Sequence, residues 1–265
     1  MSDIYSSHDI WLTIDVEEIT DTNFNLKWKH DVKLDYDKLI DNWIELNVNL
    51  NMKSTCFVLG SFAKKYPSLI KRLSDAGHEI ASHGNNHNLV YDMTLKEWEN
   101  SIIDSKNILE EITGKTVKGY RSASWSLPFE KRYYEILAKH GYSYSSSYFP
   151  MKTYMYGNSI NKKCPFNIST QNGTIKEIPI IKSIVPFSGG FYLRVIPCFI
   201  EKYFFRKLIN KGNKPIVYVH PYELLNDNLI KYFKKHLDFN LDFLLAFHSS
   251  SNPLKKIINI FNGLK

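Results

Sequence analysis

Short apolar runs alternate with amphipathic segments along much of the chain, and this alternation limits the folds that it can adopt. Apolar runs of strand length lie at 10–14, 54–59, 78–82, 117–121, 142–147 and 215–219. Segments of helical character lie at 35–50, 67–76, 94–114, 128–140 and 198–211. Repeated strand–helix units form a parallel sheet with helices outside it, either open or closed into a barrel. The sequence therefore predicts an α/β fold.

Length and composition suit a globular protein with a sizeable core. The chain has 265 residues, enough for one α/β domain or two small ones, and 43% of them are hydrophobic. Residues 150–195 are richer in Gly, Asn, Ser and Tyr, and this composition predicts loops with short strands. The segment 253–264 has the pattern of an amphipathic surface helix.

Charge and cysteine content indicate the compartment and the class of partner. The net charge is +7, but the basic residues are scattered, so the sequence does not indicate nucleic-acid binding. The three cysteines lack metal-type spacing, which favours a reducing compartment, and Met1 to Tyr5 does not resemble a secretion signal. No run approaches about 18 apolar residues, so we expect a cytoplasmic protein without a transmembrane segment. The basic tail 253–265 leaves peripheral membrane contact open, although a packed surface helix is the favoured interpretation.

Polar side chains follow four of the predicted strands. Asp15 and Glu17 come after the first apolar run, His83 after 78–82, Arg121 at the end of 117–121, and His220 after 215–219. In parallel α/β folds the chemistry gathers at the carboxyl ends of the strands. We therefore expect these five side chains to lie close together.

A metal site is the first function that this set indicates. His83 and His87 are four residues apart, and on a helical turn both imidazoles would face one ion. A hydrolytic centre needs about three protein ligands and an open position for water, so one carboxylate would complete the set. Asp15 and Glu17 leave an extended chain on the same side, so one can bind the ion while the other acts as a base. Glu17 is the preferred ligand, and Glu18 stays the alternative.

Four ordered motifs resemble the polysaccharide deacetylase family, the metal-dependent N- and O-deacetylases. The resemblance covers about residues 10–224 and is closest to the branch with surface-polysaccharide and peptidoglycan deacetylases. The motifs are Leu12–Glu17, His83–His87, Gly119–Trp125 and Val217–Glu223.

The resemblance implies a fold and a set of roles. It implies a distorted (β/α) barrel and a divalent ion, with Zn²⁺ expected, held by Glu17, His83 and His87. Asp15 is then the catalytic base, Arg121 orients it, and His220 is the general acid. We expect residues 1–265 to form a single catalytic domain, with the loop-rich insertion near 150–195 and a C-terminal helix near 253–264.

Residues for the substrate follow from the same comparison. The glycine-rich segment 188–194 resembles one that lies near the substrate in that branch and points to Gly190. We expect aromatic rings for stacking on sugars at Trp125, Tyr148, Tyr192 and Tyr222. A backbone N–H near Ser147 or Tyr148 is expected to hold the oxyanion. In the family an acid often assists the catalytic histidine, but Ser145 stands at the expected position here.

The function that results is removal of an acetyl group from an N-acetylated sugar of a polysaccharide or its precursor. The sequence does not separate N- from O-deacetylation. A deformylase or a cyclic-amide hydrolase on the same site stays open, as does a non-catalytic carbohydrate-binding protein.

Overall fold

One eight-stranded sheet organises the protein in the computed structural model, which describes residues 5, 8–29, 32–150, 157, 164–180, 189–225, 229–248 and 252–264. The strand order is β6-β7-β5-β4-β3-β2-β1-β8. The strands are β1 (Trp11–Val16), β2 (Thr55–Val58), β3 (Glu79–Ser82), β4 (Gly119–Tyr120), β5 (Tyr144–Ser145), β6 (Phe166–Thr170), β7 (Gly173–Glu177) and β8 (Ile216–Val219).

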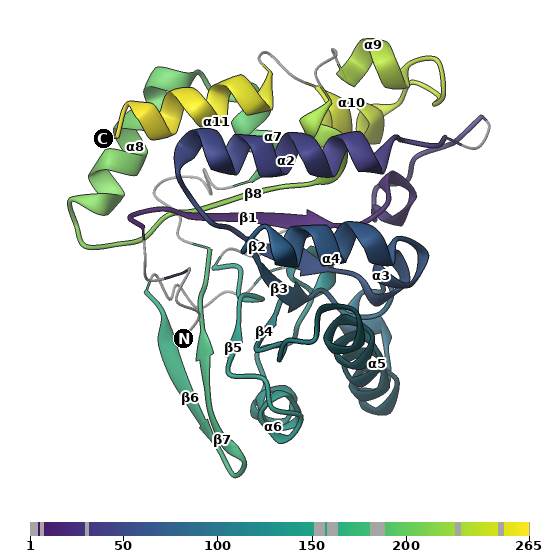
Figure 1. Cartoon of the computed structure of the whole chain (residues 1–265), viewed down its shortest axis with the longest axis vertical. Helices are drawn as coiled ribbons and strands as arrows, with labels where there is room; N and C mark the ends of the chain where they lie inside the picture. Colours follow the sequence, from purple (N-terminus) through teal and green to yellow (C-terminus); the bar gives the residue numbers. More distant parts are fainter. Residues whose placement is uncertain are drawn as a thin grey trace.

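The sheet is mostly parallel and curled into part of a barrel. The first five strands follow one another in order, β8 pairs with the free side of β1, and only β6 and β7 pair antiparallel. Strand direction turns from nearly horizontal at β1 and β8 to nearly vertical at β6 and β7 (Figure 1). The predicted α/β fold of the distorted-barrel type is confirmed. Among the described residues, strand pairing runs from β6 to β8, and these two strands do not pair with each other.

Helices cover the outer side of the sheet. The α-helices are α2 (Tyr36–Leu50), α3 (Gly60–Lys65), α4 (Pro67–Asp75), α5 (Leu95–Thr113), α6 (Lys131–Lys139), α7 (Gly190–Val195), α8 (Cys198–Ile209), α9 (Leu229–Phe233), α10 (Leu241–Phe247) and α11 (Pro253–Asn262). Short 3-10 helices are η1 (Ile19–Asp21), η2 (Val90–Asp92), η3 (Ala123–Trp125) and η4 (Pro221–Leu224). The α2 and α11 helices pack on each other, while α4 and α5 pack on β3 (Figure 1).

Local sequence signals explain where several helices begin and end. Thr94 and Glu97 form a capping box at the start of α5, with each side chain bonded to the other residue's backbone N–H. Gly114 ends α5 in the left-handed conformation at φ +66°. Because α2 buries Leu39, Ile40 and Trp43 on one face, it packs onto the core as its spacing predicts.

Two features differ from the sequence expectations, and a third segment agrees with them in part. Residues 83–89 form a loop rather than a helical turn. The α3 helix begins at Gly60, where only a strand end was expected, because Gly60 lets the chain pass close to Asn85 and to the backbone of α5. Within 150–195, the β6–β7 hairpin agrees with the short strands expected there, and α7 adds a short helix at its end; residues 151–156, 158–163 and 181–188 lie outside the described residues.

The tail helix α11 packs against the rest of the protein through its apolar face. Ile257 and Ile260 are completely buried, and Phe261 is nearly so. Within the described residues, no helix has the length and apolarity needed to cross a bilayer.

Candidate metal centre and catalytic site

The carboxyl ends of four strands bring the predicted polar residues together. Asp15 is near the end of β1, and Glu17 follows that strand directly. His83, Arg121 and His220 each follow the last residue of β3, β4 and β8. Asp15, Glu17, His83 and His220 line the same cavity, and Arg121 lies directly behind Asp15.

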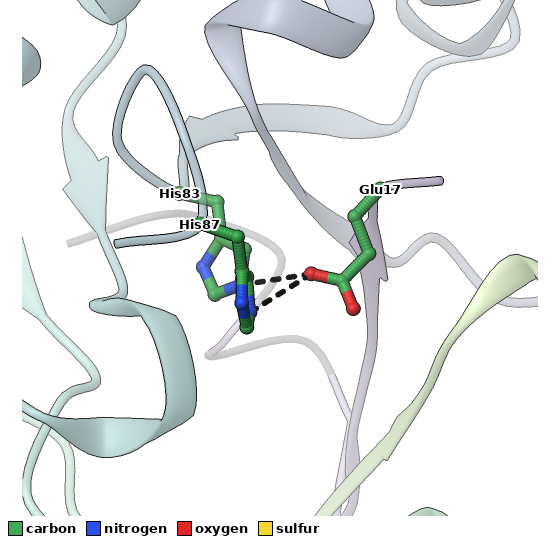
Figure 2. Close-up of side chains that lie close together, drawn as sticks. All are labelled: Glu17, His83 and His87. Carbon is green, nitrogen blue, oxygen red and sulfur yellow. Dashed lines mark ion pairs between the residues drawn. The ribbon is translucent and has the colours of Figure 1, made fainter. Parts of the chain in front are cut away.

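Glu17, His83 and His87 form a cluster that fits a divalent ion. The Glu17 Oε2 atom lies 3.0 Å from His87 Nε2 and 3.7 Å from His83 Nε2 (Figure 2). One ligand atom from each residue lies within 4.8 Å of the others. Glu17 Oε2 and His87 Nδ1 are both buried. Within the described residues, neither atom has a partner that meets the distance and angle of a hydrogen bond. Two imidazoles and a carboxylate are a donor set that Zn²⁺ prefers.

A hydrogen bond to the backbone of Arg121 fixes the ring of His83. Its Nδ1–H donates to the backbone carbonyl of Arg121 at 2.9 Å, which leaves Nε2 facing Glu17. The two imidazoles converge from a loop, in which Gly84 has φ +87°, a backbone conformation that favours glycine. The two imidazoles therefore lie close together although residues 83–87 do not form the helical turn on which the prediction relied.

Glu18, the alternative ligand, points away from the cluster. Its carboxylate accepts from Lys65 Nζ at 2.8 Å and from the Tyr66 hydroxyl at 3.1 Å. Glu17 is the acid that the fold places beside the histidines. Burial raises the pKa of Glu17, but the charges of His87, His220 and His83 outweigh it and lower the pKa to about 2.

Arg121 holds Asp15 in a fully buried ion pair. Its Nη1 donates to Asp15 Oδ1 at 2.6 Å and to Thr13 Oγ1 at 3.0 Å. The guanidinium carbon lies 3.9 Å from the centre of the Phe57 ring, and Nη2 donates to Ser146 Oγ at 3.2 Å. These contacts fix the carboxylate in one orientation, as the proposed role of Arg121 requires.

A buried carboxylate supports His220, and the sequence analysis missed it. His220 Nδ1 donates to Glu223 Oε2 at 2.9 Å, and Arg194 Nη1 lies 3.2 Å from Glu223 Oε1. Ser145, the expected partner position, donates instead to Ser147 Oγ at 2.9 Å. The acid comes from the turn that follows His220 itself. The three-residue spacing from His220 to Glu223, typical of a capping box, was the available signal.

The surroundings of His220 favour its protonated form. Burial lowers the His220 pKa, but the hydrogen bond to Glu223 and the charges of Glu17, Glu223 and Asp15 together raise it to about 9. The Nε2 atom faces the cluster, 3.9 Å from Glu17 Oε1. A protonated imidazole so placed can give a proton to a leaving group.

Part of the chain matches a family of known proteins. Residues 38–145 match the model of the polysaccharide deacetylase family. This segment of the chain belongs to the polysaccharide deacetylase family. A peptidoglycan deacetylase of Helicobacter pylori is 31% identical over 108 residues, which are 41% of this chain and 36% of the relative. A peptidoglycan-N-acetylglucosamine deacetylase of Bacillus cereus is 35% identical over 71 residues, 27% of this chain and 26% of the relative. The chain thus matches about a third or less of these curated relatives.

A solved structure shows the same polysaccharide deacetylase fold. The crystal structure of a probable polysaccharide deacetylase from Pseudomonas aeruginosa PAO1 superposes with a TM-score of 0.54 at 15% identity. The superposition covers 80% of this chain and 77% of that chain.

The second half of the chain matches a domain of unknown function (DUF3473), over residues 146–261. That segment supplies β6, β7 and β8 to the common sheet. It also supplies Arg194, His220 and Glu223 to the site. Because one sheet and one cavity take residues from both matched segments, we propose that they form a single catalytic domain.

The cavity beside the metal cluster has a volume of about 350 Å³ and largely aromatic walls. Four of the five residues predicted for the substrate line it: Trp125, Gly190, Tyr192 and Tyr222. Tyr222 stacks on His220 with an interplanar angle of 11°, so it also supports the proposed acid. The sequence analysis missed several lining residues, among them Asn23, Phe24, Ser124, Phe191 and Tyr218.

Tyr148 does not lie on the cavity wall, so its predicted stacking role is wrong. Its side chain is 1% exposed and packs edge-on against Phe129 and Phe166. The backbone N–H groups of Ser147 and Tyr148 both donate to Glu177 Oε1, at 2.8 and 2.9 Å. The two donors that were expected to hold the oxyanion are therefore already bonded.

Gly190 leaves the space that the Glu223 carboxylate occupies beside His220. A Cβ atom at Gly190 would lie 2.4 Å from Glu223 Oε1, closer than any non-bonded contact allows. We expect Gly190→Ala to displace the Glu223 carboxylate and to lower kcat by roughly 100-fold, as misplacement of a supporting group by about 1 Å does. Steady-state kinetics with an N-acetylated sugar would measure this. In a Glu223→Ala background the collision is absent, so Gly190→Ala should add little; an equal loss there would contradict the steric explanation.

Proposed function

We propose that this chain is a metal-dependent hydrolase that removes an acetyl group from an N-acetylated sugar of a polysaccharide or its precursor. One observation carries the proposal. A carboxylate held by Arg121 and an imidazole held by Glu223 line the same cavity as a Glu-His-His cluster. This is the arrangement that hydrolysis of an amide requires: a base, an acid and an electrophilic centre between them.

Glu17, His83 and His87 would hold the ion, for which we propose Zn²⁺. When bound, the ion polarises the acetyl carbonyl and lowers the pKa of water at the site. His83 is oriented for this task by the Arg121 carbonyl, and Glu17 is ionised because its pKa is about 2.

Asp15 and His220 then move the protons. Asp15 takes a proton from the attacking water, whose oxygen adds to the acetyl carbon. His220 gives its proton to the sugar nitrogen as the carbon–nitrogen bond breaks, so that acetate and a free amine are formed. Arg121 holds the Asp15 carboxylate in one orientation, and Glu223 keeps the His220 imidazole protonated at neutral pH.

The walls of the cavity support a sugar as the substrate. Trp125, Phe191 and Tyr192 lie on it, and aromatic rings of this kind stack on the apolar face of a pyranose. The curated relatives act on peptidoglycan according to their names, which supports an N-acetylated hexosamine.

Product analysis would test the proposal against its rivals. Purified protein loaded with Zn²⁺ would be incubated with a panel of N-acetylated oligosaccharides, N-formyl sugars and cyclic amides. We expect acetate release from the first group. Formate release or ring opening without acetate release would favour the deformylase or the cyclic-amide hydrolase. Binding to glycans without any turnover would identify a carbohydrate-binding protein.

A pair of neighbouring acids tests the metal site separately. We expect Glu17→Gln to weaken Zn²⁺ binding by more than roughly 100-fold, because loss of a direct ligand should exceed the effect of losing a supporting residue. Glu18→Gln is the matched control and should bind Zn²⁺ normally, since Glu18 pairs with Lys65 instead. Titration with a chromophoric chelator would measure both affinities. Equal losses in the two variants would show that Glu17 is not a specific ligand.

A further inference from the structure

The outer face of α8 exposes aromatic side chains that the proposed catalytic role does not use. Phe199 is 73% exposed and Tyr203 is 60% exposed, and they stand four residues apart on the same face of the helix. The α8 helix lies beside α11 at the edge of the molecule, near the C-terminus (Figure 1). Adjacent exposed aromatic side chains form an apolar area of the kind that contacts proteins or membranes.

The charged side chains on α8, in the turn after it and in the tail are nearly all basic. Within residues 198–214 the only acid is Glu201, and residues 249–265 contain none. Glu201 is buried in an ion pair with Lys256, 2.8 Å away, and so contributes nothing to the surface. Basic side chains remain on the outer faces of α8 and α11 and in the turn after α8: Arg206, Lys207, Lys211 and Lys255.

The C-terminal tail itself is not the membrane contact that its sequence pattern left open. Its apolar side chains Ile257, Ile260 and Phe261 are buried against the protein. The tail therefore contributes polar and basic groups to this surface, whereas Phe199 and Tyr203 supply the exposed apolar area.

We propose that the surface formed by α8 and α11, centred on Phe199, Tyr203 and Lys207, binds an anionic lipid bilayer. Lipid headgroups of negative charge complement the basic side chains of α8 and α11, whose described residues expose no acid, and aromatic rings insert at the boundary between headgroups and acyl chains. The Lys207 Nζ atom lies 5.9 Å from the centre of the Tyr203 ring, so charge and apolar area form one continuous patch. This inference does not depend on the proposed reaction.

Vesicle binding would test the proposal. We expect the protein to sediment with vesicles of equal parts phosphatidylglycerol and phosphatidylcholine at low salt, and to remain in solution with phosphatidylcholine alone or at high salt. Phe199→Ser combined with Tyr203→Ser should lower the partition coefficient by about tenfold, and Lys207→Gln combined with Lys211→Gln by a similar factor. These side chains are exposed, so the variants should fold, which circular dichroism would verify.

A second exposed apolar pair provides the matched control. Phe239 and Leu241 are 63% and 70% exposed, but Asp238 and Asp242 flank them. Phe239→Ser combined with Leu241→Ser should leave vesicle binding unchanged.

Three results would overturn the proposal. The first is that the wild-type protein does not bind anionic vesicles. The second is that the serine pair on α8 has no effect while the lysine pair abolishes binding, which would indicate a soluble polyanion. The third is that the α8 serine pair converts a lipid-free dimer to a monomer in light scattering, which would identify a self-association surface.

Discussion

Replacing Asp15 with asparagine is expected to lower kcat for acetate release by roughly 10³-fold, the typical contribution of a positioned general base. Asparagine keeps the shape of the side chain and an oxygen that can accept from Arg121, but it cannot take a proton from water. Because Glu17, His83 and His87 form the proposed metal site, the Zn²⁺ content should not change. Kinetics on the Zn²⁺-loaded variant, with its metal content measured in parallel, would check this expectation.

Stability must be measured alongside, since Asp15 and Arg121 are both buried. Removing one partner of a buried ion pair costs about 3–5 kcal/mol in typical cases, so the Tm of the variant should fall. The assay temperature should therefore lie below the transition followed by circular dichroism. Arg121→Met removes the other partner and should also lower the Tm, but it leaves the base in place and should reduce kcat less. Undiminished turnover in folded Asp15→Asn would show that another group is the base.

The positions of the proposed catalytic groups followed from the sequence because strands of a parallel sheet end at one edge. Asp15 and Glu17 were expected on the same side of an extended chain, and the fold places both on the cavity. The expectation for Arg121 and His220 had the same origin, and each directly follows a strand. Alternation of polar and apolar residues is a local pattern, so it can be recognised in the sequence without knowledge of the tertiary structure.

Residues whose roles depend on distant partners were beyond the sequence patterns. Nothing near Tyr148 in the chain shows that Phe129 and Phe166 enclose its ring. Arg194 lies on a different helix from Glu223, and only the folded chain brings them together. The pairing of Ser147 and Tyr148 N–H groups with Glu177 likewise joins β7 to the segment after β5. Contacts between elements far apart in sequence are set by packing rather than by local propensity.

The conformation of the histidine loop shows a related limit. Spacing of four residues indicated that His83 and His87 act together, and it also suggested a helix. A left-handed Gly84 instead turns the chain, and the loop is fixed by the Arg121 carbonyl on His83. Spacing alone identifies residues that can meet, but the backbone that makes them meet depends on neighbouring strands.

Replacing Glu223 with glutamine is the second change with a large expected effect, and it acts on the pH dependence. The wild-type His220 pKa is raised to about 9, in part by the hydrogen bond and charge of Glu223. In the proposed mechanism the protonated imidazole is the active form, so kcat/KM should fall as the pH rises through this pKa. Without the Glu223 charge, and with Arg194 still near, the His220 pKa should drop by roughly one to two units. The alkaline limb of the pH profile should move down by the same amount. A bound cation acts on His220 in both proteins, so the difference between the two profiles isolates Glu223.

A second buried glutamate distinguishes this effect from general damage to the fold. Glu201 is also completely buried and also pairs with a cation, Lys256 at 2.8 Å, but it lies on α8 and outside the cavity. Glu201→Gln should therefore lower the Tm while leaving the alkaline limb where it is in the wild-type protein. If Glu223→Gln lowers kcat/KM equally at every pH, Glu223 only holds the fold together and does not set the acidity of His220. If the alkaline limb moves in Glu223→Gln alone, Glu223 is the group that sets the acidity of His220. The sequence had indicated only Ser145 for this role.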